Sequence, residues 1–138
     1  MTGKRPVNPE DLAPPIGFAH AWLVEAPSVR TLYLAGQCGH NSEGVLEGVG
    51  DLVAQMDKAM GNIARVLEEA QMTFQDVMQL NFYVCSRNDY VVARKAFGKV
   101  WRKHCDKHYP AMAMFMVSSL FDADALIEIQ GIAATVES

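Results

Sequence analysis

Glu128 is the residue of this chain whose surroundings most strongly suggest chemistry. It lies between Ile127 and Ile129, in an alternating stretch that is typical of a strand. A carboxylate among isoleucines needs a hydrogen-bond donor or water, and a carboxylate so placed can act as a general acid or base. A glutamate at a strand edge that faces solvent or a salt bridge is the alternative, and the residues alone leave both interpretations open.

Two groups of cysteine and histidine residues could carry out nucleophilic chemistry or bind a metal. Cys38 and His40 follow a predicted strand and His20 lies on the neighbouring one, so these residues could form a thiol–imidazole site. A cysteine at such a position more often fills space in the core. His104 and His108 have the i, i+4 spacing of two metal ligands on a helix, but no third or fourth ligand lies nearby, and we expect no metal site.

Three methionines alternate near the carboxyl end of the chain. Met112, Met114 and Met116 fall on one face of a strand predicted over residues 111–117. Methionine is flexible and apolar, so the core or a subunit interface is favoured over a specific ligand surface. A loop then leads to the strand predicted over residues 125–135, which carries Glu128.

The rest of the chain must supply the elements that position these residues. Apolar alternation predicts strands over residues 19–25, 31–37 and 77–85, and a 3.6-residue repeat predicts helices over about residues 51–70 and 90–104. The first helix is expected to carry Asn62 on its polar side. Residues 1–15 are rich in proline, and we expect an extended, poorly ordered lead-in followed by one domain over residues 16–138.

This order of elements predicts an α+β domain with both helices on one face of a sheet. We expect the other face to be apolar because of the methionines, and an apolar sheet face should meet another subunit. No glycine-rich phosphate loop or dinucleotide-binding fingerprint is present in the sequence, and we expect no cofactor.

The composition of the 138 residues is that of one globular domain, with 50% hydrophobic and 20% charged residues. No apolar run is long enough to span a bilayer, and no apolar stretch follows the first basic residues, so we expect neither a membrane nor a secreted protein. Three widely spaced cysteines indicate free thiols in the cytoplasm. A net charge of −4 argues against a dedicated nucleic-acid binder, and we interpret the Lys and Arg cluster over residues 94–107 as the solvent face of a helix.

Short motifs along almost the whole chain resemble the RidA/YjgF family, also called the reactive intermediate deaminases. The motifs are Pro15-Ile16-Gly17, Tyr33-Leu34-Ala35-Gly36-Gln37, Gln55 with Ala59, Asn62-Ile63 and Leu67, Asp76-Val77, Phe82-Tyr83-Val84, Tyr109-Pro110-Ala111 and Ile127-Glu128-Ile129. The resemblance implies a chorismate-mutase-like α+β domain, with a sheet of about six strands and two long helices on one face. It also implies a homotrimer that binds a small molecule in clefts between its subunits.

The family's catalytic members hydrolyse enamines and imines, such as 2-aminoacrylate, to ketoacids and ammonia. The resemblance assigns to Glu128 the positioning of the attacking water. It places Gly36 and Gln37 in the backbone around the cleft, and Cys38 where the cleft loop begins.

The chain departs from the family's pattern on the strand over residues 111–117. The arginine that holds the substrate carboxylate is Met112 here, and a cysteine common two residues later is Met114. A thioether offers no donor to a carboxylate, and the loss of a bidentate arginine contact typically costs a few kcal/mol. Arg94 or Lys95, at the position of an asparagine in the second helix, could restore the missing cation.

We therefore expect a homotrimer that acts on a small enamine, imine or carbonyl metabolite without efficient 2-aminoacrylate deaminase activity. One alternative is a non-catalytic module that binds a small molecule or a partner. The other is an RNA-acting protein, which draws on the endoribonuclease labels attached to this family and on the basic helix.

Overall fold

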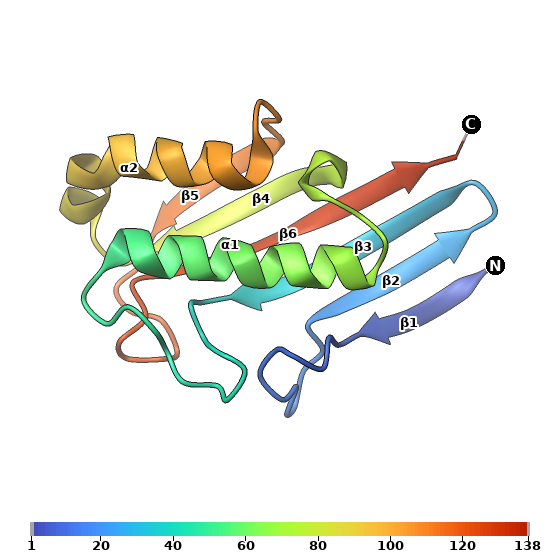
Figure 1. The fold of residues 1–138 in the computed structure, drawn as a ribbon, viewed down its shortest axis with the longest axis horizontal. Helices are drawn as coiled ribbons and strands as arrows, with labels where there is room; N and C mark the ends of the chain where they lie inside the picture. The colour runs from blue at the N-terminus through green and yellow to red at the C-terminus, as the bar shows by residue number, and fades with distance from the viewer. Residues whose placement is uncertain (1, 138) are drawn as a thin grey trace.

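The alternating and helical patterns assemble into one sheet with two long helices against it. A computed structural model describes residues 2–137 of the chain. Its six strands are β1 (Gly3–Val7), β2 (Ala21–Ala26), β3 (Val29–Gln37), β4 (Val77–Val84), β5 (Ala111–Met116) and β6 (Ile127–Val136). The helices are α1 (Leu52–Glu69) and α2 (Arg87–Cys105), and a 3₁₀ turn (Phe74–Asp76) precedes β4. Both helices lie on the same face of the sheet, so the predicted α+β fold is confirmed (Figure 1).

The order of the strands in the sheet is β1-β2-β3-β6-β4-β5. β2 and β3 form the predicted hairpin, and β6 lies between β3 and β4 and is antiparallel to both. β5 runs parallel to β4, because α2 carries the chain back to the starting end of the sheet. β4 therefore separates β6, which carries Glu128, from β5, which carries Met112.

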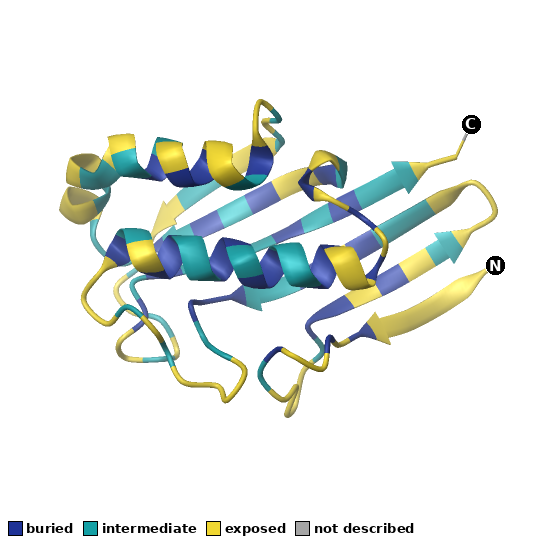
Figure 2. Ribbon diagram, in the orientation of Figure 1, coloured by how far each residue is buried: buried dark blue, intermediate teal, exposed yellow. Residues whose placement is uncertain are grey.

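The two helices begin at polar residues and bury one stripe each. The Asp51 side chain accepts a hydrogen bond from the Ala54 N–H at the start of α1, and Ser86 caps α2 in the same way. The buried stripe of α1 packs against the middle of the sheet (Figure 2). Among residues 2–137, neither helix is long and apolar enough to cross a bilayer.

The amino-terminal segment differs from the expected poorly ordered lead-in. Gly3–Val7 forms β1, which pairs antiparallel with β2. Pro6 is tolerated because an edge strand does not need every backbone N–H for pairing. Val7 is buried, and this contact ties the segment to the core.

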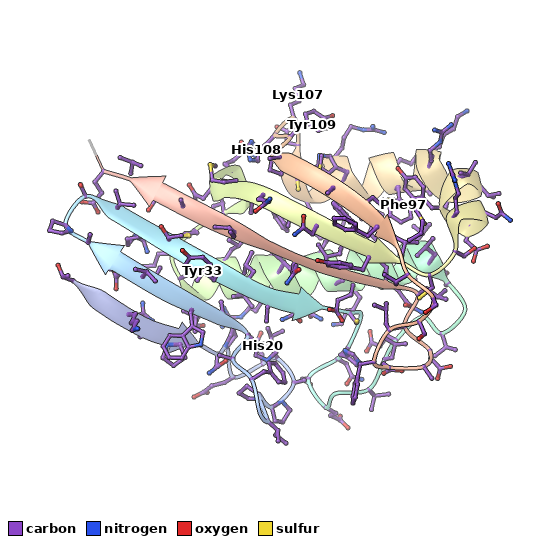
Figure 3. The ribbon with its side chains drawn as sticks, turned by 180° about the vertical axis from the view of Figure 1, so that it is seen from behind. His20, Tyr33, Phe97, Lys107, His108 and Tyr109 are labelled. Atoms are coloured by element: carbon purple, nitrogen blue, oxygen red, sulfur yellow. The ribbon has the colours of Figure 1, made fainter. Side chains whose placement is uncertain are left out.

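The sequence predicts that the methionines of β5 lie on the free face of the sheet, and the structure shows that this prediction is wrong. Met112 and Met114 line a hollow beneath α2, and Phe115 points the opposite way and stacks on Tyr83. The free face instead exposes aromatic side chains such as Trp22 and Tyr33. Seen from behind, no helix within residues 2–137 covers this face (Figure 3).

Candidate functional site

The predicted site residues gather in two separate hollows. The first, here called the Glu128 hollow, has a volume of about 140 Å³ and is lined by Gly36, Gln37, Cys38 and Glu128, together with His20 and His40. The second, called the α2 hollow, has a volume of about 450 Å³ and contains Arg94, Met112 and Met114. Within the described residues, a single chain does not bring Glu128 and Met112 together.

The Glu128 carboxylate lies across strand β3 where residue 36 has no side chain. The pairing of β3 with β6 shifts register between Leu34 and Gln37, directly beside Gly36. A Cβ atom on residue 36 would overlap the Glu128 Oε2 atom and would lie 2.8 Å from its carboxyl carbon. Glu128 is half-buried, so its carboxylate is sheltered and still reachable by a small molecule.

Cys38 is a hydrogen-bond donor to Glu128 and not an activated nucleophile. Its Sγ donates to Glu128 Oε1 at 3.4 Å. Burial raises the pKa of the Cys38 thiol far above its ordinary value, and the nearby Glu128 charge raises this pKa further. A thiol held protonated in this way attacks substrates poorly.

Neither histidine of the Glu128 hollow pairs with the Cys38 thiol. The His20 ring donates from Nε2 to the Ala13 carbonyl at 2.8 Å, and its Nδ1 accepts from the Gln37 amide at 2.9 Å. With the Ala13 carbonyl as acceptor and the Gln37 amide as donor, these two partners match the Nε2–H tautomer of His20. His40 Nε2 instead donates to Asp122 at 3.0 Å, and this hydrogen bond lowers the pKa of Asp122. The proposed thiol–imidazole site is therefore not formed.

Two buried amides of α1 position the Glu128 hollow, and the sequence analysis names both only as motif residues, without a role in the site. Asn62 Nδ2 donates to the carbonyls of Cys38 (3.2 Å) and His40 (2.9 Å). Gln55 accepts from the Leu126 N–H at 2.8 Å, two residues before Glu128. The helical pattern predicts Asn62 on the polar side of the helix, but the structure buries it. Asn62 lies seven residues after Gln55, which puts both on the same apolar face of the helix, and this spacing could have indicated that Asn62 is buried.

Of the two candidate cations, Arg94 lines the α2 hollow and Lys95 does not. Its lining also includes Arg102, Trp101 and Tyr109, to which the sequence analysis gave no role in the site. Tyr109 and the buried Phe97 of α2 are labelled in Figure 3. A cation in this hollow shares it with Met112 and could hold a carboxylate there.

His104 and His108 have separate partners and do not face a common ligand. His104 Nε2 lies 2.6 Å from Asp57 Oδ1, and Lys103 contacts the same carboxylate at 2.8 Å. Hydrogen bonds from Lys103 and then His104 lower the pKa of Asp57. His108 Nε2 donates to the Val77 carbonyl at 2.7 Å. Across residues 2–137, no three Cys, His, Asp or Glu side chains are grouped as a metal site would require.

Comparison with known proteins gives one consistent result. Residues 17–135 match the family model described as Endoribonuclease L-PSP. The RutC family protein UK114 of Drosophila melanogaster is 30% identical over 106 residues, which cover 77% of this chain and 73% of that protein. The 2-iminobutanoate/2-iminopropanoate deaminase of Capra hircus is 27% identical over 116 residues, covering 84% and 78%. The crystal structure of the YjgF gene product from E. coli shares the fold, with a TM-score of 0.76, 22% identity and coverage of 94% and 97%.

Proposed function

We propose a function from one premise: this chain belongs to the RidA/YjgF family. The goat relative is named a 2-iminobutanoate/2-iminopropanoate deaminase. We propose that this chain likewise hydrolyses an imine or enamine of a small metabolite to a carbonyl compound and ammonia. We further propose that 2-aminoacrylate is a poor substrate.

The placement of the Glu128 carboxylate is the observation that supports hydrolysis. One carboxylate oxygen, Oε1, accepts a hydrogen bond from the Cys38 thiol, and the other lies over Gly36. The hollow around it is small, and a small hollow leaves room for a water beside a reacting carbon. A carboxylate held in a sheltered site can take a proton from that water.

The proposed reaction consumes one water for each imine. The water oxygen bonds to the imine carbon while Glu128 accepts one water proton and passes it to the nitrogen, which gives a carbinolamine. The C–N bond then breaks as the carbonyl forms, and Glu128 transfers the hydroxyl proton to the leaving nitrogen, which departs as ammonia. The protonated Cys38 thiol keeps the carboxylate oriented through both steps.

Met112 supports the proposal that 2-aminoacrylate is a poor substrate. Its thioether cannot donate to the substrate carboxylate, and Arg94 is the candidate cation in the same hollow. Arg94 projects from a helix and not from β5, so it would hold a carboxylate at a different position than an arginine at residue 112. A substrate that differs in length from 2-aminoacrylate would then place its imine carbon best for attack by water.

A neighbouring copy of the chain completes the site in this proposal. On β4, Glu128 pairs with Tyr83 and Met112 pairs with Leu80, so the two side chains point to opposite faces of the sheet and a cleft with both needs two copies. The exposed aromatic residues of the free face, such as Trp22, Tyr33 and Phe115, support burial of this face between subunits. We propose a homotrimer with one small-molecule cleft at each subunit boundary. Three free cysteines support a cytoplasmic location.

The test measures ammonia release from 2-aminoacrylate, generated in situ, and from bulkier 2-imino acids. We expect weak activity of the wild type towards 2-aminoacrylate, a gain in Met112→Arg, and a loss of at least tenfold in Glu128→Gln with every imine. Glu68→Gln, an exposed carboxylate on α1, is the matched control. Full activity of Glu128→Gln would remove the proposed role of this carboxylate.

A non-catalytic binding module is the second candidate, and Met112 is the observation that favours it. Such a protein would keep the clefts and bind ligand without turning it over. Saturable binding of an imino or oxo acid, together with inert wild type and inert Met112→Arg, would favour this alternative over hydrolysis.

A further inference from the structure

The α2 hollow is larger and more aromatic than a three-carbon imino acid requires. Its volume of about 450 Å³ falls within the range of about 300–1,000 Å³ that is usual for drug-sized ligands. Trp101 and Tyr109 stack with ring centres 6.1 Å apart and planes 14° from parallel. Phe82, on strand β4 beneath the helix, has its ring centre 6.2 Å from that of Trp101. Trp101 and Tyr109 are nearly parallel and Phe82 is tilted by 55° from Trp101, so the hollow has an aromatic lining suited to another ring.

Two arginines of this hollow lack a partner within the chain. Among residues 2–137, no carboxylate or carbonyl accepts a hydrogen bond from Arg94 or Arg102. Other arginines of the chain do have acceptors: Arg65 contacts Asp11 and Glu69, and Arg30 donates to the Ala70 carbonyl. Arginine stays charged at all ordinary pH values, so two unpaired guanidinium groups beside one hollow favour an anion.

Gly98 lets the two arginines share this hollow. Residues 94, 98 and 102 follow one another along a single side of α2. A Cβ on residue 98 would lie 3.3 Å from Arg102 Nη1, so the Arg102 side chain runs back over the glycine towards Arg94. The guanidinium of Arg102 therefore approaches the half of the hollow that Arg94 lines.

We infer that the α2 hollow binds an aromatic carboxylate, with its carboxylate between Arg94 and Arg102 and its ring against Trp101 and Tyr109. The inference rests on the proposed function in naming its substrate class, a 2-imino acid with an aromatic side chain. Met112 fits this ligand, because a thioether packs well against the edge of a ring. An arginine at residue 112 would instead place a hydrated charge where the ring lies.

The binding test uses three probes that separate the ring from the charge. Phenylpyruvate has both groups, pyruvate has only the acid, and phenylacetamide has the ring without the charge. By calorimetry on the full chain, we expect phenylpyruvate to bind at least tenfold more tightly than either of the other two. Arg94→Met and Arg102→Met should each weaken phenylpyruvate binding at least tenfold, and Lys99→Met, an exposed cation on the same helix, should leave it unchanged.

Each outcome bears on the inference separately from hydrolysis. Equal binding of pyruvate and phenylpyruvate, or an equal loss in Lys99→Met, would overturn it. If only small imines are turned over and phenylpyruvate does not bind, the inference fails while the proposed function stands. If phenylpyruvate binds through both arginines but no imine is hydrolysed, the inference stands and the hydrolase proposal fails.

Discussion

The Glu128 carboxylate occupies the space that a side chain on residue 36 would fill. The glycine at this position is not needed for an unusual backbone angle, because Gly36 is not among the residues with positive φ. What the glycine provides is room, next to the irregular pairing of β3 with β6. Gly36 and Glu128 are therefore one structural unit, and a substitution of either residue should change the position or surroundings of the other.

Gly36→Ala should impair hydrolysis while preserving the fold. The new methyl group meets the flexible end of Glu128, so the carboxylate must swing away, and the backbone can stay in place. We expect kcat for the imine substrate to fall at least tenfold, which corresponds to about 1.4 kcal/mol in the barrier. Steady-state kinetics and thermal unfolding measure the two effects.

The control for this prediction is Gly61→Ala, in α1. A Cβ at residue 61 meets no atom within 4 Å. This variant should be stabilised by up to about 1 kcal/mol through helix propensity and should keep its activity. Unchanged kcat in Gly36→Ala would show that the carboxylate orientation does not matter.

All three thiols should resist alkylation in the native protein. Burial raises the pKa of Cys105 to about 12 and also raises the pKa of Cys85, and burial together with Glu128 raises the pKa of Cys38. Each unit of increase lowers the reactive thiolate about tenfold. Iodoacetamide at pH 8, followed by peptide mass mapping, should label the native protein at least tenfold more slowly than the urea-unfolded chain.

A fast native reaction at Cys38 would contradict this and restore the nucleophile hypothesis. Cys38→Ser is the informative variant, since a hydroxyl keeps a donor near Glu128 and removes the sulfur. Imine hydrolysis by Cys38→Ser should stay within about threefold of wild type, because the oriented carboxylate is retained and no covalent step is used.

Asp57 should stabilise the protein above acidic pH and lose this effect on acidification. Hydrogen bonds from Lys103 and His104 lower the pKa of Asp57 in the folded chain. The stabilisation is therefore fully present above the unfolded value of about 3.9, and it disappears as pH falls through the lower folded value. Asp57→Asn should cost about 0–1 kcal/mol at pH 6, as is usual for an exposed pair.

Urea unfolding at a series of pH values tests this prediction. The difference in unfolding free energy between wild type and Asp57→Asn should be constant above about pH 5 and should shrink below about pH 4. Glu68→Gln, which removes an exposed carboxylate without a hydrogen-bond or ion-pair partner in the described part of the chain, should show no such difference. A difference that grows on acidification would contradict the assigned sign.

Local patterns predict most elements of this fold, and pairing across the sheet accounts for what they miss. The 3.6-residue repeat and the Asp51 cap locate α1 to within a residue or two. Alternation places Met112 and Met116 on one side of β5 but cannot say which side faces the helices. That choice depends on the β6-β4-β5 order, and it moves Met112 away from Glu128 within one chain. β1 was missed because its pairing with β2 is not local.

Local sequence patterns also predict part of the candidate site, and the rest depends on contacts between distant segments. Glu128 stands out because it lies between two isoleucines, Gly36 was found through motif resemblance, and the structure places them in contact. Arg102 was missed because an exposed arginine in a basic helix looks like ordinary surface charge. Asn62 was missed because a polar residue near the border of a helical stripe is assigned by angle alone. Its buried position is decided by the loop carbonyls that it binds.

Gln55 should connect the stability of the fold to the position of Glu128. Its amide nitrogen donates to the carbonyls of Gly48 and Asp124, both at 3.1 Å, and its oxygen accepts from the Leu126 N–H. Gln55→Met preserves side-chain length and leaves these groups without partners, which should cost about 1–3 kcal/mol. Because Leu126 immediately precedes β6, we also expect kcat for imine hydrolysis to fall severalfold.

Gln75→Met is the matched substitution for this last prediction. Gln75 also donates from its side chain, to the Cys105 carbonyl at 3.2 Å, but it is exposed and lies far along the chain from Glu128. It should change stability by no more than about 0.5 kcal/mol, as is usual for surface substitutions, and should leave kcat unchanged. Equal losses of activity in both variants would show that kcat follows general destabilisation. A loss confined to Gln55→Met would show that the buried amide holds the start of β6, and with it the carboxylate, in the orientation that hydrolysis uses.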